Sequence, residues 1–234
     1  MPISLHNNKF QKLTGTLFYA YTQLFLLFCG LNAVIIGIIY RKRLKDIQLL
    51  IVYPAASIIE TTSSPYINSE SPWLKEMGVP EMSANIFLLI EFLIIYHFFF
   101  QILGHKKLRR LLYAIAIIYL LSIITMWVFT ETFYKNADIL FVPQAICILI
   151  PTICYFFQLI KKPSDIDLRN VPAFWITTGI LLYFGCTLPL FLINSILDYS
   201  VAFERNIYSI NFLCYGLLFI FIIKAYLCKK TEVQ

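Results

Sequence analysis

The chain has 234 residues, of which 59% are apolar, 17% aromatic and only 14% charged. Soluble domains contain about 25% charged residues, so this composition excludes a soluble globular protein and predicts a protein embedded in a lipid bilayer. The formal net charge of +6 does not indicate nucleic-acid binding, because the basic residues stand in short clusters at the ends of apolar runs, where membrane topology explains them.

Seven apolar runs are long enough, at about 20 residues, to cross a bilayer as helices. In chain order they cover residues 18–40, 47–66, 84–103, 110–131, 138–160, 171–196 and 206–228. The second run is the weakest, because it contains Pro54 and Glu60, but without it the basic loops on either side would fall on opposite faces of the membrane. The first run is too long for a signal sequence, so we expect it to remain in the mature protein. We therefore predict an all-α polytopic membrane protein, with residues 1–234 forming a single domain of seven transmembrane helices in one bundle.

Lysine and arginine gather in every second connection between these runs, and cytoplasmic loops are enriched in such residues. Fourteen fall in the first, third and fifth loops and at the C-terminal end: Arg41, Lys42, Arg43, Lys45, Lys106, Lys107, Arg109, Arg110, Lys161, Lys162, Arg169, Lys224, Lys229 and Lys230. The opposite face has only five, which are Lys9, Lys12, Lys75, Lys135 and Arg205. The distribution predicts an N-terminus outside the membrane and a C-terminus in the cytoplasm.

Two acidic residues, Glu60 and Glu91, lie inside the second and third runs. A charge at the bilayer centre costs about 2.5–3.5 kcal/mol, so such a residue is expected to have a partner, a cavity or a function. Because these two helices are antiparallel, both glutamates are predicted to lie at the same depth, in the outer third of the membrane. We hypothesise an outward-opening polar pocket there that binds a small ligand, a cation or a proton. Its other predicted lining residues are Gln23, Gln144, Asn194, Asn211 and Tyr215. For the amides and the tyrosine, the alternative is a structural role in hydrogen bonds between helices.

His97 and Gln101 lie deeper in the third run, one helical turn apart. Six residues of helix place His97 about 120° around the axis from Glu91, so the two do not form a dyad. We interpret His97 as a structural histidine with a hydrogen bond, and the alternative is a proton relay through His97 and Gln101.

No catalytic or metal site is visible in the sequence, and we predict that the chain is not an enzyme and has no cofactor. The three histidines, His6, His97 and His105, are too few and too dispersed for a zinc hydrolase. Lys224 lies too near the cytoplasmic end of the seventh run to form the retinal Schiff base of a microbial rhodopsin. The six cysteines form no CxxC pair and no nucleophile has a visible base.

Two stretches are distinctive: NIFLLIEFLIIYHFFFQIL at 85–103, and VPAFWITTGILLYFGCTLPLFLIN at 171–194, which follows a short basic linker. Together they resemble small seven-helix inner-membrane proteins of Bacteroidota, which look like the seven-helix sensory input modules attached to or encoded near signalling kinases. The resemblance implies location in the cytoplasmic (inner) membrane of a bacterium and a sensory role. The sequence shows no effector domain before Gln234, so a sensor of this kind is expected to act through another protein.

Three functions remain open from the sequence. The first is a sensory or signal-relay protein whose polar pocket faces outward and whose partner binds at the cytoplasmic loops or within the membrane. The second is an ion- or proton-coupled transporter or channel component, and the third is an accessory subunit of a larger membrane complex. Assembly of the chain into a homo-oligomer is compatible with each of them. A polar path from Glu91 through His97 and Gln101 to the cytoplasm favours transport, whereas an apolar layer there favours sensing or a structural role.

Overall fold

The computed structural model describes residues 3–41, 49–70, 79–129, 138–161, 167–196 and 201–228. Within these residues the chain forms seven long helices and no strand. The helices are α1 (Ile3–Tyr40), α2 (Val52–Glu70), α4 (Val79–Ile102), α5 (Lys106–Phe129), α7 (Asp138–Lys161), α8 (Pro172–Ile196) and α9 (Val201–Leu227), and a short 3-10 turn, η2 (Leu168–Asn170), precedes α8. The predicted all-α polytopic bundle is confirmed.

Six of these helices are long and apolar enough to cross a membrane. The exception among the described residues is α2, whose apolar part, Leu49–Ser63, is shorter than a full span. This is the segment that the sequence already marks as the weakest, because a proline and several hydroxyl residues dilute its apolar character. The chain is therefore an integral membrane protein whose helices contact the lipid bilayer.

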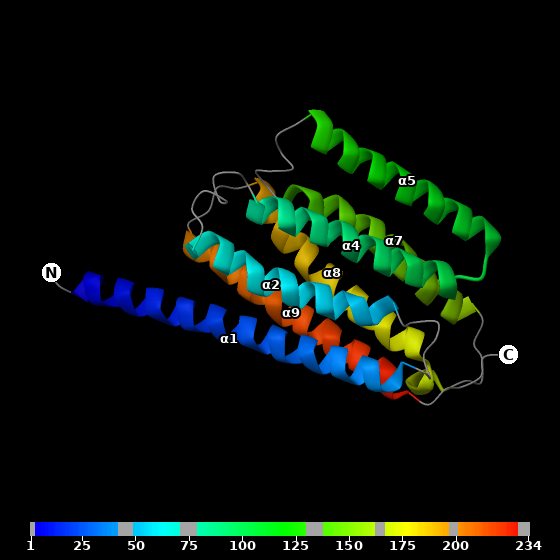
Figure 1. Cartoon of the computed structure of the whole chain (residues 1–234), viewed down its shortest axis with the longest axis horizontal. Helices are drawn as coiled ribbons and strands as arrows, with labels where there is room; N and C mark the ends of the chain where they lie inside the picture. The colour runs from blue at the N-terminus through cyan, green and yellow to red at the C-terminus, as the bar shows by residue number, and fades with distance from the viewer. Residues whose placement is uncertain are drawn as a thin grey trace.

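Successive helices run in alternating directions (Figure 1). Contacts between neighbours close a ring in the order α1, α2, α4, α7, α8 and α9, with α9 packed again on α1. Helix α5 lies outside this ring, where it packs on α7 and, more weakly, on α4. The centre of the ring is the core that the functional site occupies.

Glycines allow the closest helix approaches in this ring. A Cβ atom at Gly37 of α1 would lie 2.8 Å from Ile51 Cγ1, and one at Gly179 of α8 would lie 2.8 Å from Phe221 Cβ of α9. Without a hydrophobic force between helices in lipid, close packing of this kind is a main source of helix association. The contact at Gly37 holds α1 near the ends of its neighbours, and the contact at Gly179 holds α8 against α9.

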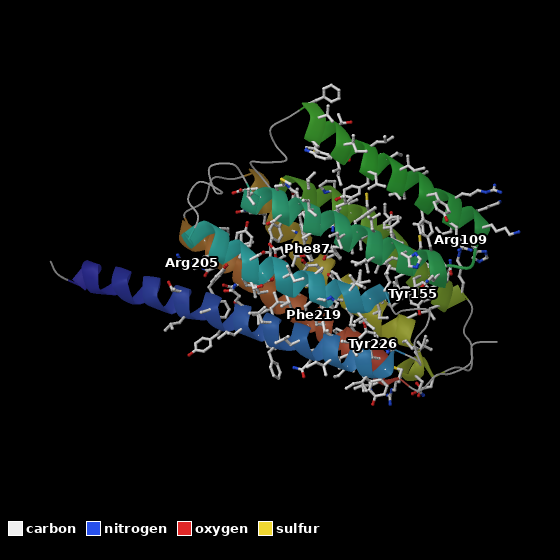
Figure 2. The ribbon with its side chains drawn as sticks, in the orientation of Figure 1. Phe87, Arg109, Tyr155, Arg205, Phe219 and Tyr226 are labelled. Carbon is white, nitrogen blue, oxygen red and sulfur yellow. The ribbon has the colours of Figure 1, made fainter. Side chains whose placement is uncertain are left out.

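The alternating directions bring eight described basic residues to one end of the bundle, which we call the basic end. It holds Arg41, Lys106, Lys107, Arg109, Arg110, Lys161, Arg169 and Lys224. Arg205 lies at the opposite end, and Figure 2 shows it far from Arg109. Other basic residues used for the orientation lie outside the described residues, namely Lys42, Arg43, Lys45, Lys75, Lys135, Lys162, Lys229 and Lys230, and the side chains of Lys9 and Lys12 are not described either. The cytoplasmic position of the basic end stays a prediction.

Labelling of single cysteines tests that orientation. Lys107→Cys at the basic end is expected to react with a membrane-impermeant maleimide only after the cells are permeabilised, because basic ends stay in the cytoplasm. Thr16→Cys, at the other end of the bundle, is expected to react in intact cells, and the unsubstituted chain measures the background from its native cysteines. The reverse pattern would contradict the orientation.

Candidate functional site

The core of the ring contains a carboxyl group that is completely shielded from the surface. Glu91 of α4 has 0% of its surface exposed. The Tyr53 hydroxyl of α2 donates a hydrogen bond to one carboxyl oxygen at 2.6 Å, and Gln144 Nε2 of α7 donates to the other at 2.7 Å. One side chain thereby connects three helices, and both of its oxygens are occupied.

The peripheral helix α5 joins this group through Tyr119. Its hydroxyl donates to Gln144 Oε1 at 3.0 Å, and its ring lies 4.3 Å from that of Phe92. Since Gln144 accepts from Tyr119 through its oxygen, its amide nitrogen is directed at Glu91. We call Glu91, Tyr53, Gln144 and Tyr119 the Glu91 network, which spans four helices.

Tyr215 of α9 lies on the other side of Tyr53. The two rings are 5.7 Å apart, and the Tyr215 hydroxyl is placed beside Ser57 and Tyr53. Tyr215 is buried, yet its hydroxyl forms no hydrogen bond of normal geometry among the described residues. A buried polar atom without a hydrogen bond is uncommon and indicates a strained, catalytic or ligand-dependent position.

Aromatic rings enclose this part of the core. Tyr183 of α8 stacks on Tyr215 at 4.8 Å, and Phe219 lies 4.8 Å from Tyr215 and 5.7 Å from Tyr53. The ring of Phe87 lies 6.5 Å from those of Tyr53 and Tyr215, and Figure 2 places Phe87 and Phe219 in the middle of the bundle. The Glu91 network is therefore packed in a closed aromatic environment.

Helix α4 orients Glu91 inward because its outward face is apolar. Ile86, Ile90 and Leu93 are exposed at spacings of three and four residues, which is one face of a helix. Glu91 and Phe92 lie on the opposite side and are buried. An orientation with Glu91 toward lipid would place the carboxyl group in hydrocarbon without its hydrogen-bond partners, so the helix has a strongly preferred rotation.

The two glutamates do not lie at the same depth. Tyr53, and not Glu60, is level with Glu91, and seven residues of α2 separate Tyr53 from Glu60. At 1.5 Å per residue, Glu60 lies about 10 Å nearer the Arg205 end. The expectation of equal depth, which counts residues from the predicted outer ends of the two runs, does not hold, because the α2 residue that pairs with Glu91 is Tyr53, seven positions nearer the basic end than Glu60. Glu60 is half-buried and remains close enough to Glu91 to interact with it electrostatically.

The other predicted pocket residues divide between two levels. Gln144 and Tyr215 lie at the level of Glu91. Gln23 lies at the level of Glu60, where its Nε2 donates to the Thr61 backbone oxygen at 3.3 Å. Asn211 and Asn194 are partly buried and lie farther toward the Arg205 end on α9 and α8. That these residues form one binding pocket stays a prediction.

His97 and Gln101 are separated from the Glu91 network. Both are exposed on the outer side of α4, and Gln101 Nε2 lies 3.0 Å from His97 Nε2. The hydrogen bond expected of a structural histidine is present. On the inward side of α4, the residues between Glu91 and the basic end are the buried Ile95, Phe99 and Leu103, so the structure does not bring the proposed relay pair into the core.

Two tyrosines of the site, Tyr53 and Tyr119, are not among the residues that the sequence singles out. Tyr53 had a signal, because Tyr53, Ser57 and Glu60 share one face of α2 at spacings of four and three. No sequence pattern marks Tyr119, because the chain has 15 tyrosines and one more within an apolar run does not stand out.

The arrangement contains an acid, an amide and several hydroxyl groups, which suit proton or cation recognition and helix coupling. Among the described residues, no group of three or more His, Cys, Asp or Glu is placed to hold a metal ion. No protein family, curated protein or solved structure matches the chain. The function therefore has to be inferred from the geometry of the site.

Proposed function

We propose that this chain is a sensory or signal-relay protein of the bacterial inner membrane, with the Glu91 network as its responsive element. The observation that carries the proposal is the fully buried carboxyl group held by Tyr53 and Gln144 from two other helices. An intramembrane acid is costly and is retained for a function or a tight pairing. A change in its charge or ligation would be felt by α2, α4 and α7 together.

An apolar layer between Glu91 and the basic end supports sensing over transport. Among the described residues it is formed by buried side chains of α4, α7 and α9: Ile95, Phe99, Leu103, Ile148, Phe219 and Ile222. Thr152 lies at this level too, but its hydroxyl donates to the Ile148 backbone oxygen of its own helix. Thr177 and Tyr226 add buried hydroxyl groups in this half of the core, but the described residues there include no buried carboxylate or amide side chain. An ion would have to cross the layer with hydroxyl ligands alone, which is expensive in a low-dielectric interior.

Tyr53 is the element that would pass the signal on. Its hydroxyl donates to Glu91, while the Tyr215 hydroxyl beside it has an unused hydrogen-bonding capacity. If the Glu91 carboxyl gains a proton or binds a cation, Tyr53 turns its hydrogen toward Tyr215. This switch connects α4 and α2 to α9, which continues to Lys224 at the basic end. A partner protein bound to the basic loops would read the change.

A second function, an accessory subunit of a membrane complex, is favoured by one observation. His97 and Gln101 form an exposed polar pair on a helix face that otherwise presents apolar side chains. Polar groups in spans usually face other protein. In this alternative, another chain covers that face, and chemical crosslinking through His97→Cys in the native membrane would capture it.

Stability measurements on the full chain in nanodiscs test the sensory proposal. The midpoint of thermal unfolding is recorded over a pH series and with NaCl, KCl, CaCl₂ and MgCl₂. A probe that acts on Glu91 is expected to shift the midpoint by about 2–4 °C, which corresponds to about 1 kcal/mol. Glu91→Gln should remove the shift, whereas Glu81→Gln, the same change on α4 outside the core, should keep it. A wild-type response that both variants share would contradict a role for Glu91.

A flux measurement separates sensing from transport. Proteoliposomes that contain the chain and a trapped pH dye are expected to show no proton or sodium conductance above empty liposomes, because the apolar layer blocks the inner half of the core. A conductance that Glu91→Gln abolishes and Glu81→Gln leaves intact would replace the sensory proposal by the transporter alternative.

A further inference from the structure

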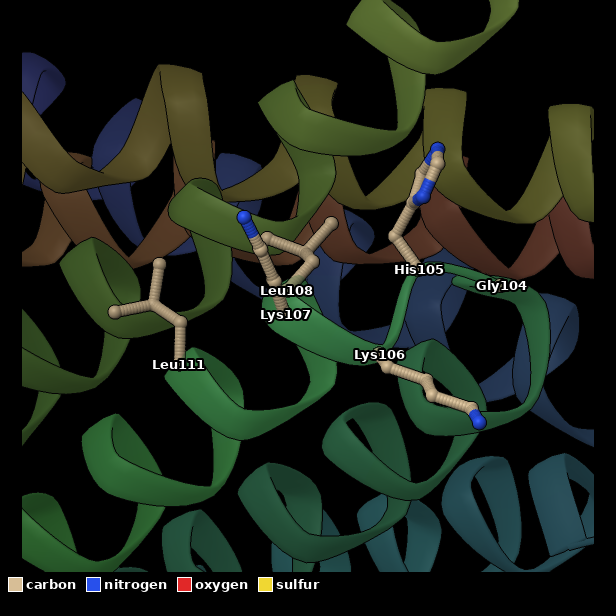
Figure 3. A pocket seen from close by; sticks show the side chains of 6 residues that line it. All are labelled: Gly104, His105, Lys106, Lys107, Leu108 and Leu111. Atoms are coloured by element: carbon tan, nitrogen blue, oxygen red, sulfur yellow. The ribbon is translucent and has the colours of Figure 1, made fainter.

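The turn between α4 and α5 holds a cavity at the basic end, separate from the Glu91 network. It is lined by Gly104, His105, Lys106, Lys107, Leu108 and Leu111 and has a volume of about 760 Å³. Figure 3 shows His105 and Lys107 on the same side of the turn as Leu108 and Leu111, with Lys106 directed away from them. The cavity is a shallow depression that is widely open to the surface, so it can receive a small polar headgroup but does not enclose it.

The cationic groups around this cavity are not neutralised. Lys106, Lys107, Arg109 and Arg110 are exposed within five positions of one another, and none forms an ion pair among the described residues. The described carboxylate at this end, Asp167, accepts hydrogen bonds from Arg169 and Asn170 of its own turn. Uncompensated charges on a low-dielectric surface create a positive potential that attracts anions.

The depth and the lining of the cavity limit the kind of anion. Helix α4 ends at Ile102 and α5 begins at Lys106, so the cavity lies where two candidate membrane spans end. This is the level of the lipid headgroups. Leu108 and Leu111 extend the lining from the basic residues toward the hydrocarbon region, which suits a ligand with a charged head and an apolar tail. The N-terminal end of α5 adds a weaker preference for negative charge.

We propose that this cavity binds the phosphate headgroup of an anionic phospholipid. Lys107 contacts the phosphate, the exposed Lys106 turns toward it when the lipid binds, and Leu108 and Leu111 contact the first part of an acyl chain. The inference does not depend on the proposed function. A bound lipid would fix the start of α5, the helix that lies outside the ring and reaches the Glu91 network through Tyr119.

Lipid titration of the purified full chain tests this site. The chain in zwitterionic detergent is titrated with short-chain phosphatidylglycerol, with phosphatidylcholine and with inorganic phosphate, and binding is followed by native mass spectrometry and by the thermal midpoint. Phosphatidylglycerol is expected to bind and to raise the midpoint. Lys106→Gln with Lys107→Gln should weaken this binding about tenfold or more, since each basic residue near an anionic surface contributes substantially.

The matched control is Arg109→Gln with Arg110→Gln, which removes the same charge from residues that do not line the cavity. It is expected to change the affinity less than threefold. Equal losses in both double variants would show attraction by diffuse charge and overturn the proposal, as would equal binding of phosphatidylcholine. Binding of inorganic phosphate as tight as that of phosphatidylglycerol would also overturn it, because the apolar part of the site would then contribute nothing. If the lysine double variant does not remain monodisperse, Lys107→Gln and Arg110→Gln replace the two double variants.

Discussion

Replacing Glu91 by alanine is expected to lower the free energy of unfolding by about 2–4 kcal/mol. The substitution leaves the Tyr53 hydroxyl and the Gln144 amide without their acceptor in a fully buried core. Each unpaired buried donor costs about 1–3 kcal/mol, and the removed side chain leaves a cavity. Hydrogen bonds between membrane helices contribute less than this on average, which sets the lower end of the range.

Glutamine at the same position is expected to be tolerated, with a change of about 1 kcal/mol or less. Its carbonyl oxygen accepts from Gln144, and its amide donates to the oxygen of Tyr53. Tyr53 then has to donate elsewhere, and the Tyr215 hydroxyl, which forms no hydrogen bond among the described residues, lies beside it. The contrast between alanine and glutamine therefore tests the same rearrangement that the sensory proposal requires.

The measurement is reversible unfolding in mixed micelles, followed by circular dichroism. Leu93→Ala is the control, because Leu93 lies two residues away on the exposed face of α4 and its truncation should cost little. If Glu91→Gln were as destabilising as Glu91→Ala, the network would need a carboxylate, and the turn of Tyr53 toward Tyr215 would be refuted. Equal effects of Glu91→Ala and Leu93→Ala would deny the network any structural role.

The fold was predictable from the sequence because its signals are local. Each span is an apolar run of membrane-spanning length, and each connection carries its own charge signal, so neither depends on contacts between distant residues. The sequence marks 47–66 as the weakest of the seven runs, and the structure agrees, because the apolar part of α2 is shorter than a full membrane span. The relative height of two helices was less accurate, because Glu91 pairs with Tyr53 and Glu60 therefore lies nearer the Arg205 end.

The site was predictable only in part, because it depends on how helices rotate and slide against one another. Helical geometry alone correctly separated His97 from Glu91, since both lie on one helix. The pairing of Glu91 with Tyr53 and Gln144 joins residues 38 and 53 positions apart, and no local pattern encodes the relative height of three helices. Tyr119 enters the network only because α5 packs on α7 from outside the ring.

Replacing Gly179 by leucine is expected to lower the free energy of unfolding by about 2–3 kcal/mol or more. A Cβ atom at Gly179 would lie 2.8 Å from Phe221 Cβ and 2.9 Å from Leu218 Cδ1. The Cβ of Phe221 cannot rotate away, so α8 and α9 would have to separate. The backbone at Gly179 has no left-handed φ, so the requirement for glycine here is the close approach alone.

Gly185→Leu is the matched control for this prediction, because Gly185 lies on the same helix and faces outward, and a Cβ atom there would meet no other described atom within 4 Å. Leucine at this position gains helix propensity and lipid contact, so the free energy of unfolding should stay the same or rise by about 0.5–1 kcal/mol. Both variants are compared by unfolding in the same micelles.

Separation of α8 from α9 would also move the ring of Tyr183 away from that of Tyr215, because the two rings stack at 4.8 Å. If Gly179→Leu still folds, it should therefore weaken the cation or proton response that we propose for the Glu91 network. Retention of full stability and full response in Gly179→Leu would show that the α8–α9 contact does not hold the site together.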